Sequence, residues 1–233
     1  MPQPLLSARD LRTDPVGAAT RILGSEMVVT GDDGEVRLRV VEVEAYGGPP
    51  DGPHPDPAAH SYPGITPRNT VMFGPAGRLY VYRSYGIHLC VNISCGAAGT
   101  AAAVLLRAGE VLTGDEVVRR RRHPVVDQRR WAMGPGNFGS AVGIRLDDNG
   151  VDVLDPNSPI RLERPARRRT TSTSAGPRVG LTVATGRPWR LWITDSPAVS
   201  AFRPGSAEVL RRRAAAAADR LAVSDADAEG SDW

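Results

Sequence analysis

The sequence predicts an α+β fold: a single compact domain built on a mixed, mostly antiparallel, curved β-sheet with flanking helices. Two observations lead to this prediction. Segments with the alternating apolar and polar pattern of strands outnumber segments with a helical pattern. The predicted strands are also joined by short turns, which favours antiparallel pairing over a doubly wound sheet. With 233 residues, 41% of them apolar, the chain is long enough for one sizeable core.

Three helices are predicted. The first is capped by Asp14, has Pro15 at its first position and ends at Gly24. The second has acidic residues early and arginines late, which suits the helix dipole. The third follows the break at Gly134-Pro135-Gly136. The predicted helices span residues 14–24, 110–122 and 137–143.

Seven strands are predicted from alternation and flanking turn residues. The first two form a hairpin across the turn Asp32-Asp33-Gly34, and the third and fourth form another across Ser84-Tyr85-Gly86. The predicted strands span residues 26–30, 35–46, 78–83, 87–95, 102–107, 178–184 and 189–194.

Two long loops and a tail complete the chain. A proline-rich loop is expected at 47–68, and such a length is uncommon in a compact domain unless the loop has a function. A loop rich in Arg, Ser and Thr is expected at 165–176. The single domain is predicted to span residues 1–210, and the Ala-rich and then acidic segment 211–233 is expected to be a flexible tail.

Composition excludes several classes of protein. No apolar run approaches 18 residues and the N-terminus has no leader pattern, so no membrane association and a cytoplasmic location are expected. Cys90 and Cys95 lie in an apolar run and are expected to be free. No CxxC or HExxH motif occurs, so no metal is expected. All 29 basic residues are arginine, so only the chain terminus could supply an amine for a Schiff base.

Carboxylates are prominent at the end of the segment 35–46. Glu42, Glu44 and Tyr46 share one face of this predicted strand. The intervening residues, expected to face the core, are Val41, Val43 and Ala45. A carboxylate beside an aromatic residue and before a long polar loop is well placed for a site. The alternative is an exposed hairpin with two solvated glutamates.

Three tyrosines fall within six positions, although aromatic residues make up only 5% of the chain. Tyr80 and Tyr82 share a strand face, and Tyr85 lies on the turn itself. A tyrosine at a turn suits a wedge between base pairs or a platform for a base. Ordinary cross-strand packing explains Tyr80 readily but does not explain Tyr85.

Polar residues of the next two strands are further candidates. Asn92 shares a face with His88 and Cys90 and could read a base edge, or could be a satisfied amide within the sheet. Arg107 ends an apolar run and requires a carboxylate or phosphate partner, which a structural ion pair would also supply. Arginine clusters at 119–122, 167–169 and 211–213 have phosphate-binding potential but could equally be solvated surface.

Five blocks of the sequence resemble, in order, the alkyladenine or 3-methyladenine DNA glycosylases. The blocks are VVEVEAYGG (40–48), DPAAHSYPGITPRNTVMFGPAGRLYVYRSYGIHLCVNIS (56–94), VLLRAGE (104–110), GPGNFGSAVGI (134–144) and RPWRLWITDSPAVS (187–200). The resemblance implies a DNA-intercalating β-hairpin, activity on alkylated purines and often on deaminated or etheno-bridged ones, and no metal or cofactor. It also implies damaged duplex DNA as the partner of an enzyme that we expect to be a monomer.

The resemblance also implies roles for individual residues in hydrolysis. Glu44 matches the general base that activates water, and Arg107 matches an arginine that helps to hold that water and the phosphate side of the substrate. Val199 matches a residue whose backbone carbonyl touches the same water.

Other matches concern the base pocket. Tyr46 matches one wall, and His60 and Tyr82 match the opposite wall. Asn92 matches an asparagine that excludes guanine, and Tyr85 matches the tyrosine that enters the minor groove. The loop 47–68 is longer than the resemblance leads us to expect and also contains His54, which leaves His54 as an alternative to His60.

Two alternative functions remain open at this point. The first is a glycosylase-lyase that uses the terminal amine, which would be that of Pro2 after removal of Met1. The second is a non-catalytic protein that binds lesions without releasing a base.

Overall fold

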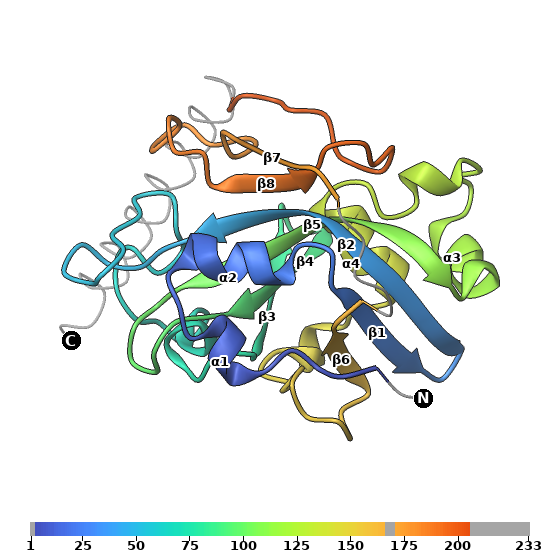
Figure 1. Ribbon diagram of the computed structural model, residues 1–233, viewed down its shortest axis with the longest axis horizontal. Helices are drawn as coiled ribbons and strands as arrows, with labels where there is room; N and C mark the ends of the chain where they lie inside the picture. The colour runs from blue at the N-terminus through green and yellow to red at the C-terminus, as the bar shows by residue number, and fades with distance from the viewer. Residues whose placement is uncertain (1–2, 166–170, 206–233) are drawn as a thin grey trace, which may run out of the picture.

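Strand β2 (Gly34–Tyr46) is the spine of the computed structural model, which describes residues 3–165 and 171–205 (Figure 1). Strand β5 (Ala103–Thr113) pairs with it over almost its whole length. On the other edge of β2, β1 (Glu26–Gly31) pairs with the first half and β8 (Arg190–Ile193) with the second half. The strands β1, β5 and β8 therefore all pair directly with this one element.

The remaining strands extend the sheet from these central pairs. The hairpin β3 (Leu79–Ser84) and β4 (His88–Ser94) adds to β5 through β4. Strand β6 (Ile160–Glu163) adds to β1, and β7 (Thr173–Gly176) adds to β8. All seven strand pairs are antiparallel. The prediction of an α+β fold with a single domain around a mostly antiparallel, curved sheet is confirmed.

Short helices cover this sheet (Figure 1). The α-helices are α1 (Ala8–Leu11), α2 (Pro15–Ile22), α3 (Asp115–Arg122) and α4 (Pro135–Val142), and 3-10 turns lie at Thr70–Phe73, Gln128–Arg130 and Leu146–Asp148. One large apolar core joins residues of α1, α2 and α4 to those of β1–β6. No helix among the described residues is long and apolar enough to span a bilayer.

Most of the predicted elements are confirmed. Helix α2 is capped by Asp14, whose carboxylate accepts hydrogen bonds from Val16 N and Gly17 N, and Gly24 follows it with a φ of +84°. Both predicted hairpins are present. Cys90 and Cys95 are free and buried, as expected. Helix α4 begins two residues earlier than predicted because Pro135 occupies its first turn.

Three predicted elements are wrong in whole or in part. Residues 110–113 were expected in a helix but continue β5, because the ladder with β2 extends to Thr113; a left-handed Gly114, with a φ of +89°, then separates strand from helix. Residues 178–184 form no strand, since Arg178 and Val179 bond to groups of the site described below. Part of the predicted loop 165–176 is instead β7. The predicted tail 211–233 and the arginines at 167–169 and 211–213 lie outside the described residues.

The ladder between β2 and β5 has three register shifts, of which two lie next to Glu42. Val41 is the extra residue between the pairs Val40–Gly109 and Glu42–Ala108, and Arg107 is the extra residue on β5. Val41 consequently packs into a small second cluster with Ala108, instead of reaching the main core with Val43 and Ala45. Val41 is buried, as expected, but in this second cluster and not beside Val43 and Ala45.

The contact between α4 and β4 is close enough to require glycine. A Cβ built on Gly139 would lie 2.2 Å from the carbonyl oxygen of Leu89. We predict that Gly139→Ala forces the helix off the sheet and lowers the free energy of unfolding by about 1–3 kcal/mol. Thermal melts should show a lower Tm, whereas Gly186→Ala, which has open space around its Cβ, should melt like the wild type. Equal melting of both variants would contradict the packing.

Candidate active site

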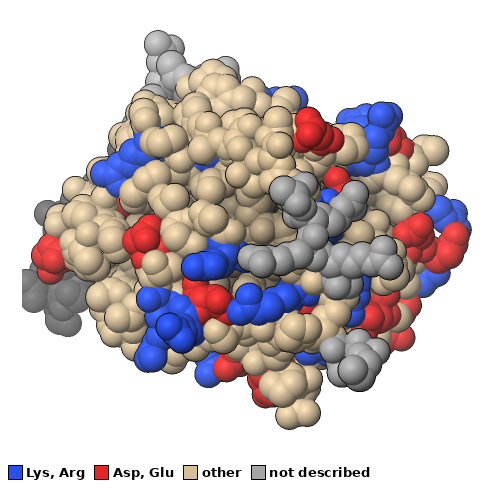
Figure 2. Space-filling model, viewed as in Figure 1, with Lys and Arg blue, Asp and Glu red and all other residues tan. Residues whose placement is uncertain are grey.

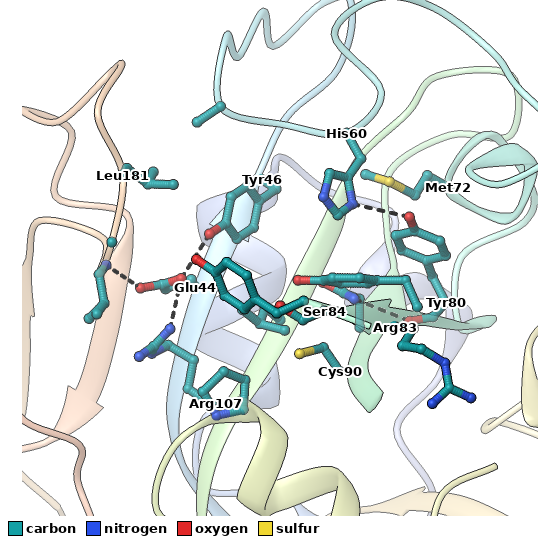
Figure 3. Close-up of a pocket in the computed structure, with 18 of the residues that line it drawn as sticks. Glu44, Tyr46, His60, Met72, Tyr80, Arg83, Ser84, Cys90, Arg107 and Leu181 are labelled. Atoms are coloured by element: carbon teal, nitrogen blue, oxygen red, sulfur yellow. Dashed lines mark hydrogen bonds and ion pairs between the residues drawn. The ribbon is translucent and has the colours of Figure 1, made fainter. Parts of the chain in front are cut away.

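A cavity of about 830 Å³ opens on the polar face of the sheet, where β2 to β5 meet the loop 47–68 and the segment 179–181 (Figure 3). Its volume lies within the range of small-molecule sites. The sheet supplies alternate residues of four neighbouring strands because side chains on one face recur every second position. The residues from the sheet that line the cavity are Glu44, Tyr46, Tyr80, Tyr82, Arg83, Ser84, Cys90, Asn92, Leu105 and Arg107.

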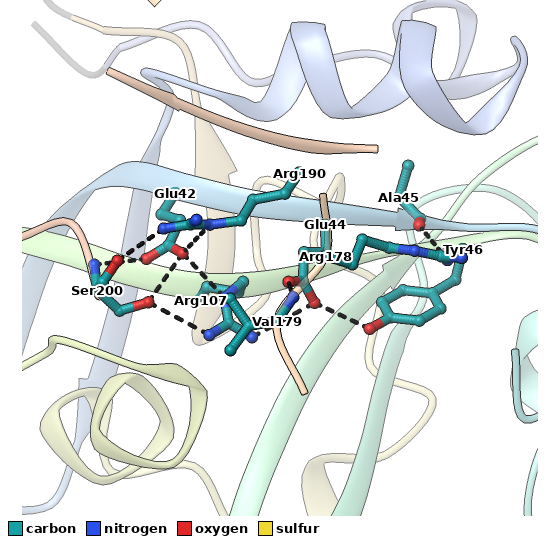
Figure 4. Close-up of polar contacts among 9 residues, drawn as sticks. All are labelled: Glu42, Glu44, Ala45, Tyr46, Arg107, Arg178, Val179, Arg190 and Ser200. Atoms are coloured by element: carbon teal, nitrogen blue, oxygen red, sulfur yellow. Dashed lines mark hydrogen bonds and ion pairs between the residues drawn. The ribbon is translucent and has the colours of Figure 1, made fainter. Parts of the chain in front are cut away.

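Glu44 lies at the floor of this cavity and is fully buried. Its Oε1 accepts a hydrogen bond of 2.6 Å from the backbone N–H of Val179, and its Oε2 accepts one of 2.8 Å from the hydroxyl of Tyr46. Arg107 Nη1 lies 3.3 Å from the same Oε2 (Figure 4). The carboxylate therefore accepts two hydrogen bonds, one on each oxygen, and forms an ion pair with Arg107.

Glu42, on the same face of β2, is also fully buried and orients Arg107. Its Oε1 accepts from Arg107 Nε at 2.9 Å and from Arg190 Nε at 2.7 Å. Ser200 adds its backbone N–H at 2.8 Å and its hydroxyl at 2.9 Å (Figure 4). Two glutamates with no exposed surface exclude the alternative of a solvated hairpin. Arg107 thus forms the structural ion pair with Glu42 and also reaches Glu44 in the cavity.

The electrostatics of this network keep Arg107 charged. Burial lowers the pKa of Arg107, but the adjacent Glu44 and Glu42 outweigh burial and the net shift is upward. The pKa of Tyr46 is raised well above its usual range, first by burial and then by the charge of Glu44. Tyr46 consequently stays a neutral donor to Glu44 at physiological pH.

Aromatic rings form the walls above Glu44. His60 meets Tyr82 edge to face with ring centroids 4.6 Å apart, and Tyr82 stacks on Tyr80 at 5.6 Å. The Nδ1 of His60 lies 3.1 Å from the Tyr80 hydroxyl. Tyr46 also lines the cavity, and a gap separates its ring from that of His60 (Figure 3). His60 lines the cavity and His54 does not, so the geometry favours His60 as the pocket histidine.

The loop 47–68 presents His60 because buried polar side chains hold the loop together. Asp56 and Ser61 are fully buried, and Asn69 follows the loop with 2% exposure. Asp56 accepts from Gly47 N, Ser61 donates to Gly47 O, and Asn69 donates to the carbonyls of His60 and Gly64. The length of this loop therefore has a structural function: it forms one side of the cavity.

Asn92 lies at the cavity wall, and its amide is bonded within the sheet, which is one of the two alternatives that the sequence left open. It lines the cavity, and its Nδ2 donates 3.1 Å to the carbonyl of Tyr80 within the β3–β4 hairpin. The side-chain amide is thereby held in one orientation at the cavity wall.

Tyr85 is displayed at the tip of the β3–β4 hairpin, at the mouth of the cavity. Its side chain is 72% exposed, and Ile87 beside it is 71% exposed. Both Tyr85 and Gly86 have positive φ, +50° and +71°, as in the primed turns of tight hairpins. A bulky residue with positive φ is uncommon and costs conformational energy. The turn therefore exposes the Tyr85 side chain to solvent and does not pack it against the protein.

Other candidates from the sequence fall outside the cavity. Val199 is half-buried against the Val41 cluster and does not line the cavity, although Ser200 next to it contacts Glu42 and Arg107. In the cluster 119–122, Arg119 pairs with Glu116 and Arg121 with Asp33, so these two charges have partners within the chain. On the face that carries α1 and α2, acidic and basic side chains are interleaved (Figure 2).

Sequence reasoning missed Arg190, Ser200, Asp56 and Arg178 as parts of the site. The available signal was a charged residue inside an otherwise apolar alternating run, as at Arg190 between Trp189 and Leu191. Among residues 3–165 and 171–205, no group of three or more His, Cys, Asp or Glu side chains could hold a metal ion.

Comparison with known proteins identifies the family of this chain. The sequence profile of the methylpurine-DNA glycosylase (MPG) family matches residues 9–197. A protein of Rhodococcus jostii (strain RHA1) named "Putative 3-methyladenine DNA glycosylase" is 57% identical over 192 residues, covering 82% of this chain and 83% of its own. Proteins of the same name from Mycobacterium tuberculosis (strain ATCC 25618 / H37Rv) and Mycobacterium bovis (strain BCG / Pasteur 1173P2) are 54% identical over 201 residues, covering 86% of this chain and 96% of theirs.

The family profile spans most of the chain and includes Glu44, Arg107 and the tyrosines of the cavity. The chain belongs to the methylpurine-DNA glycosylase family, as its five sequence blocks indicate.

Proposed function

We propose that this protein removes alkylated purines, such as 3-methyladenine, from duplex DNA by hydrolysing the N-glycosidic bond, with Glu44 as the general base. One observation carries the proposal: a buried carboxylate with two hydrogen-bond donors and an arginine partner lies at the floor of an aromatic cavity large enough for a purine. The family and its relatives support DNA as the substrate.

Access to this cavity requires the nucleotide to leave the duplex. A base that is stacked within the duplex cannot reach Glu44 at the floor of the cavity. Extruding a damaged or mispaired base from the duplex costs less free energy than extruding a normal one. Tyr85 enters the minor groove and fills the space that the flipped nucleotide leaves. Its exposure at the mouth of the cavity supports this role.

Hydrolysis follows from the position of Glu44. A water molecule on Glu44 attacks C1′ of the sugar as the bond from C1′ to the purine nitrogen breaks. The electron pair of that bond goes to the base, and the proton of the water goes to Glu44. The carboxylate also stabilises the oxocarbenium-like sugar electrostatically. Arg107 keeps Glu44 in place.

Selection of the lesion combines several modest effects. Purines alkylated at N3 or N7 carry a positive charge and leave without an enzymic acid, and the aromatic walls attract them by about 0.5–2 kcal/mol per ring. Asn92 excludes guanine by contact with its 2-amino group. Neutral lesions such as hypoxanthine and ethenoadenine fit the same walls but leave less readily. We propose that the enzyme acts as a monomer without a cofactor.

The first prediction concerns the general base. Glu44→Gln should lower the single-turnover rate of base release by about 100- to 10,000-fold, because an amide cannot take the proton from water. Binding to lesion duplexes should persist. Chromatography of free base released from oligonucleotides with one defined lesion measures the rate. Glu110→Gln alters a carboxylate of β5 outside the cavity and should keep the normal rate; normal turnover by Glu44→Gln would refute the assignment.

A second prediction concerns the wedge. Tyr85→Ala should weaken binding to lesion duplexes by about 1–3 kcal/mol, because the vacated stack is left unfilled. Fluorescence anisotropy with labelled duplexes measures Kd. The control Val126→Ala truncates another exposed apolar side chain, 91% exposed and away from the cavity, and should not change Kd. Unchanged affinity in Tyr85→Ala would rule out the wedge.

The lyase alternative gives a third prediction. Because the chain has no lysine, borohydride treatment during turnover should trap no covalent protein–DNA adduct. A trapped adduct that disappears when the terminal amine is blocked would establish the glycosylase-lyase instead. Binding of lesion duplexes without release of any base would favour the non-catalytic alternative.

A further inference from the structure

We propose that Arg178 and Asp56 are positioning residues for base release, because their buried ion pair places both hydrogen-bond donors, Val179 N–H and the Tyr46 hydroxyl, that hold Glu44. The inference rests on the proposed role of Glu44 and extends it to residues outside the cavity lining.

The pair itself is bidentate and has no exposed side-chain surface. Arg178 Nη1 and Nη2 donate to the two carboxylate oxygens of Asp56 at 2.6 and 2.8 Å, and both side chains are 0% exposed. Burial raises the pKa of Asp56, but Arg178 outweighs burial and the net shift is downward, so the carboxylate is charged at neutral pH.

This ion pair connects three segments that are distant in the sequence. Asp56 also accepts from Gly47 N at 3.1 Å and from Ala58 N at 3.2 Å, within the loop 47–68. Arg178 Nη1 donates 3.0 Å to the carbonyl of Ala45 at the end of β2 (Figure 4). The loop, the strand end and the segment around Arg178 are thereby joined at one point.

The first connection between the Arg178–Asp56 ion pair and Glu44 is through the backbone. Val179 follows Arg178 directly, and its N–H donates 2.6 Å to Glu44 Oε1. This segment belongs to no strand, so no ladder fixes the direction of that N–H. The contacts that fix it on either side are the ion pair at Arg178 and the hydrogen bond of 2.8 Å from Gly180 N to Arg203 O.

A second connection runs through Tyr46. The guanidinium of Arg178 lies 4.6 Å from the centroid of the Tyr46 ring and 5.3 Å from that of Trp189. Tyr46 lines the cavity and Arg178 does not, so the cation supports the ring from behind. The hydroxyl of Tyr46 in turn donates 2.8 Å to Glu44 Oε2. One ion pair thus acts on both carboxylate oxygens of Glu44.

Energetics also favour a positioning role over a stabilising one. A buried ion pair is often no more stable than apolar residues of similar volume, because desolvation offsets the attraction. A bidentate pair does, however, fix the orientation of its two side chains relative to each other. A fixed Glu44 matters because small misplacements of a catalytic group reduce the rate strongly.

The test compares two neutralised ion pairs. The combined change Asp56→Asn and Arg178→Met removes both charges, so neither is left buried alone. The control, Arg37→Met with Glu163→Gln, removes both charges of a less buried pair, 2.7 Å apart with side chains 19% and 6% exposed, that joins β2 to β6 outside the cavity. Melts establish that each variant folds, anisotropy gives its Kd for a lesion duplex, and single-turnover assays give its rate of base release.

The first variant should bind the duplex within about threefold of the wild type yet release base about 10- to 100-fold more slowly. The control should keep its rate within about twofold whatever its Tm. Equal rates in the two variants would overturn the inference. Should the first variant fail to fold, Arg178→Lys takes its place: it keeps the charge but not the bidentate geometry, and an unchanged rate there would also overturn it.

Combining the neutralised ion pair with Glu44→Gln distinguishes failure of this inference from failure of the proposed function. If Arg178 acts through Glu44, neutralising the pair should slow Glu44→Gln by less than about twofold, because the effects of residues that act together do not multiply. A full additional loss would show that the pair acts otherwise than through Glu44. Normal activity of Glu44→Gln alone would instead reject the general base itself.

Discussion

Two glutamates, Glu42 and Glu44, are buried on the same face of β2, and a buried carboxylate is costly unless charge and hydrogen bonds compensate for the lost water. Here Arg107 and Arg190 bond to Glu42, while Tyr46 and the Val179 amide bond to Glu44. The two networks meet at Arg107, which contacts both carboxylates. Much of the architecture around the cavity can be understood as the means of supplying these donors.

The donors come from elements that only the complete fold brings together. Arg107 is placed by a bulge on β5 and Arg190 by β8, which pairs with β2 beside the bulge on that strand. Val179 is placed by a segment fixed through the Arg178–Asp56 pair. A water-excluding floor of this kind strengthens electrostatic interactions with a developing positive charge. Burial of Glu44 is therefore unfavourable for folding but strengthens its interaction with a positively charged sugar, as the proposed function requires.

Local patterns in the sequence were sufficient for the sheet and for part of the site. Alternation predicted both hairpins and the face shared by Glu44 and Tyr46, and the scarcity of aromatic residues made the exposed Tyr85 conspicuous. The resemblance, not the pattern, singled out His60. The predictions for residues 110–113 and 178–184 were wrong because long-range contacts overrode local preference. Residues 110–113 pair with β2, and Arg178 forms a buried ion pair with Asp56. Arg190, a partner of Glu42, was missed for the same reason: it is 148 positions away in the chain.

The central claim is that Glu44 directs water at the sugar of a nucleotide that has left the duplex. A crystal structure with a duplex that carries a cationic pyrrolidine in place of one deoxyribose tests it most directly, because this ring imitates the charged sugar. The account predicts the pyrrolidine in the cavity, a water between its nitrogen and Glu44, and Tyr85 inserted where the nucleotide was stacked. A pyrrolidine still within the duplex, or Glu44 turned away from it, would contradict the account.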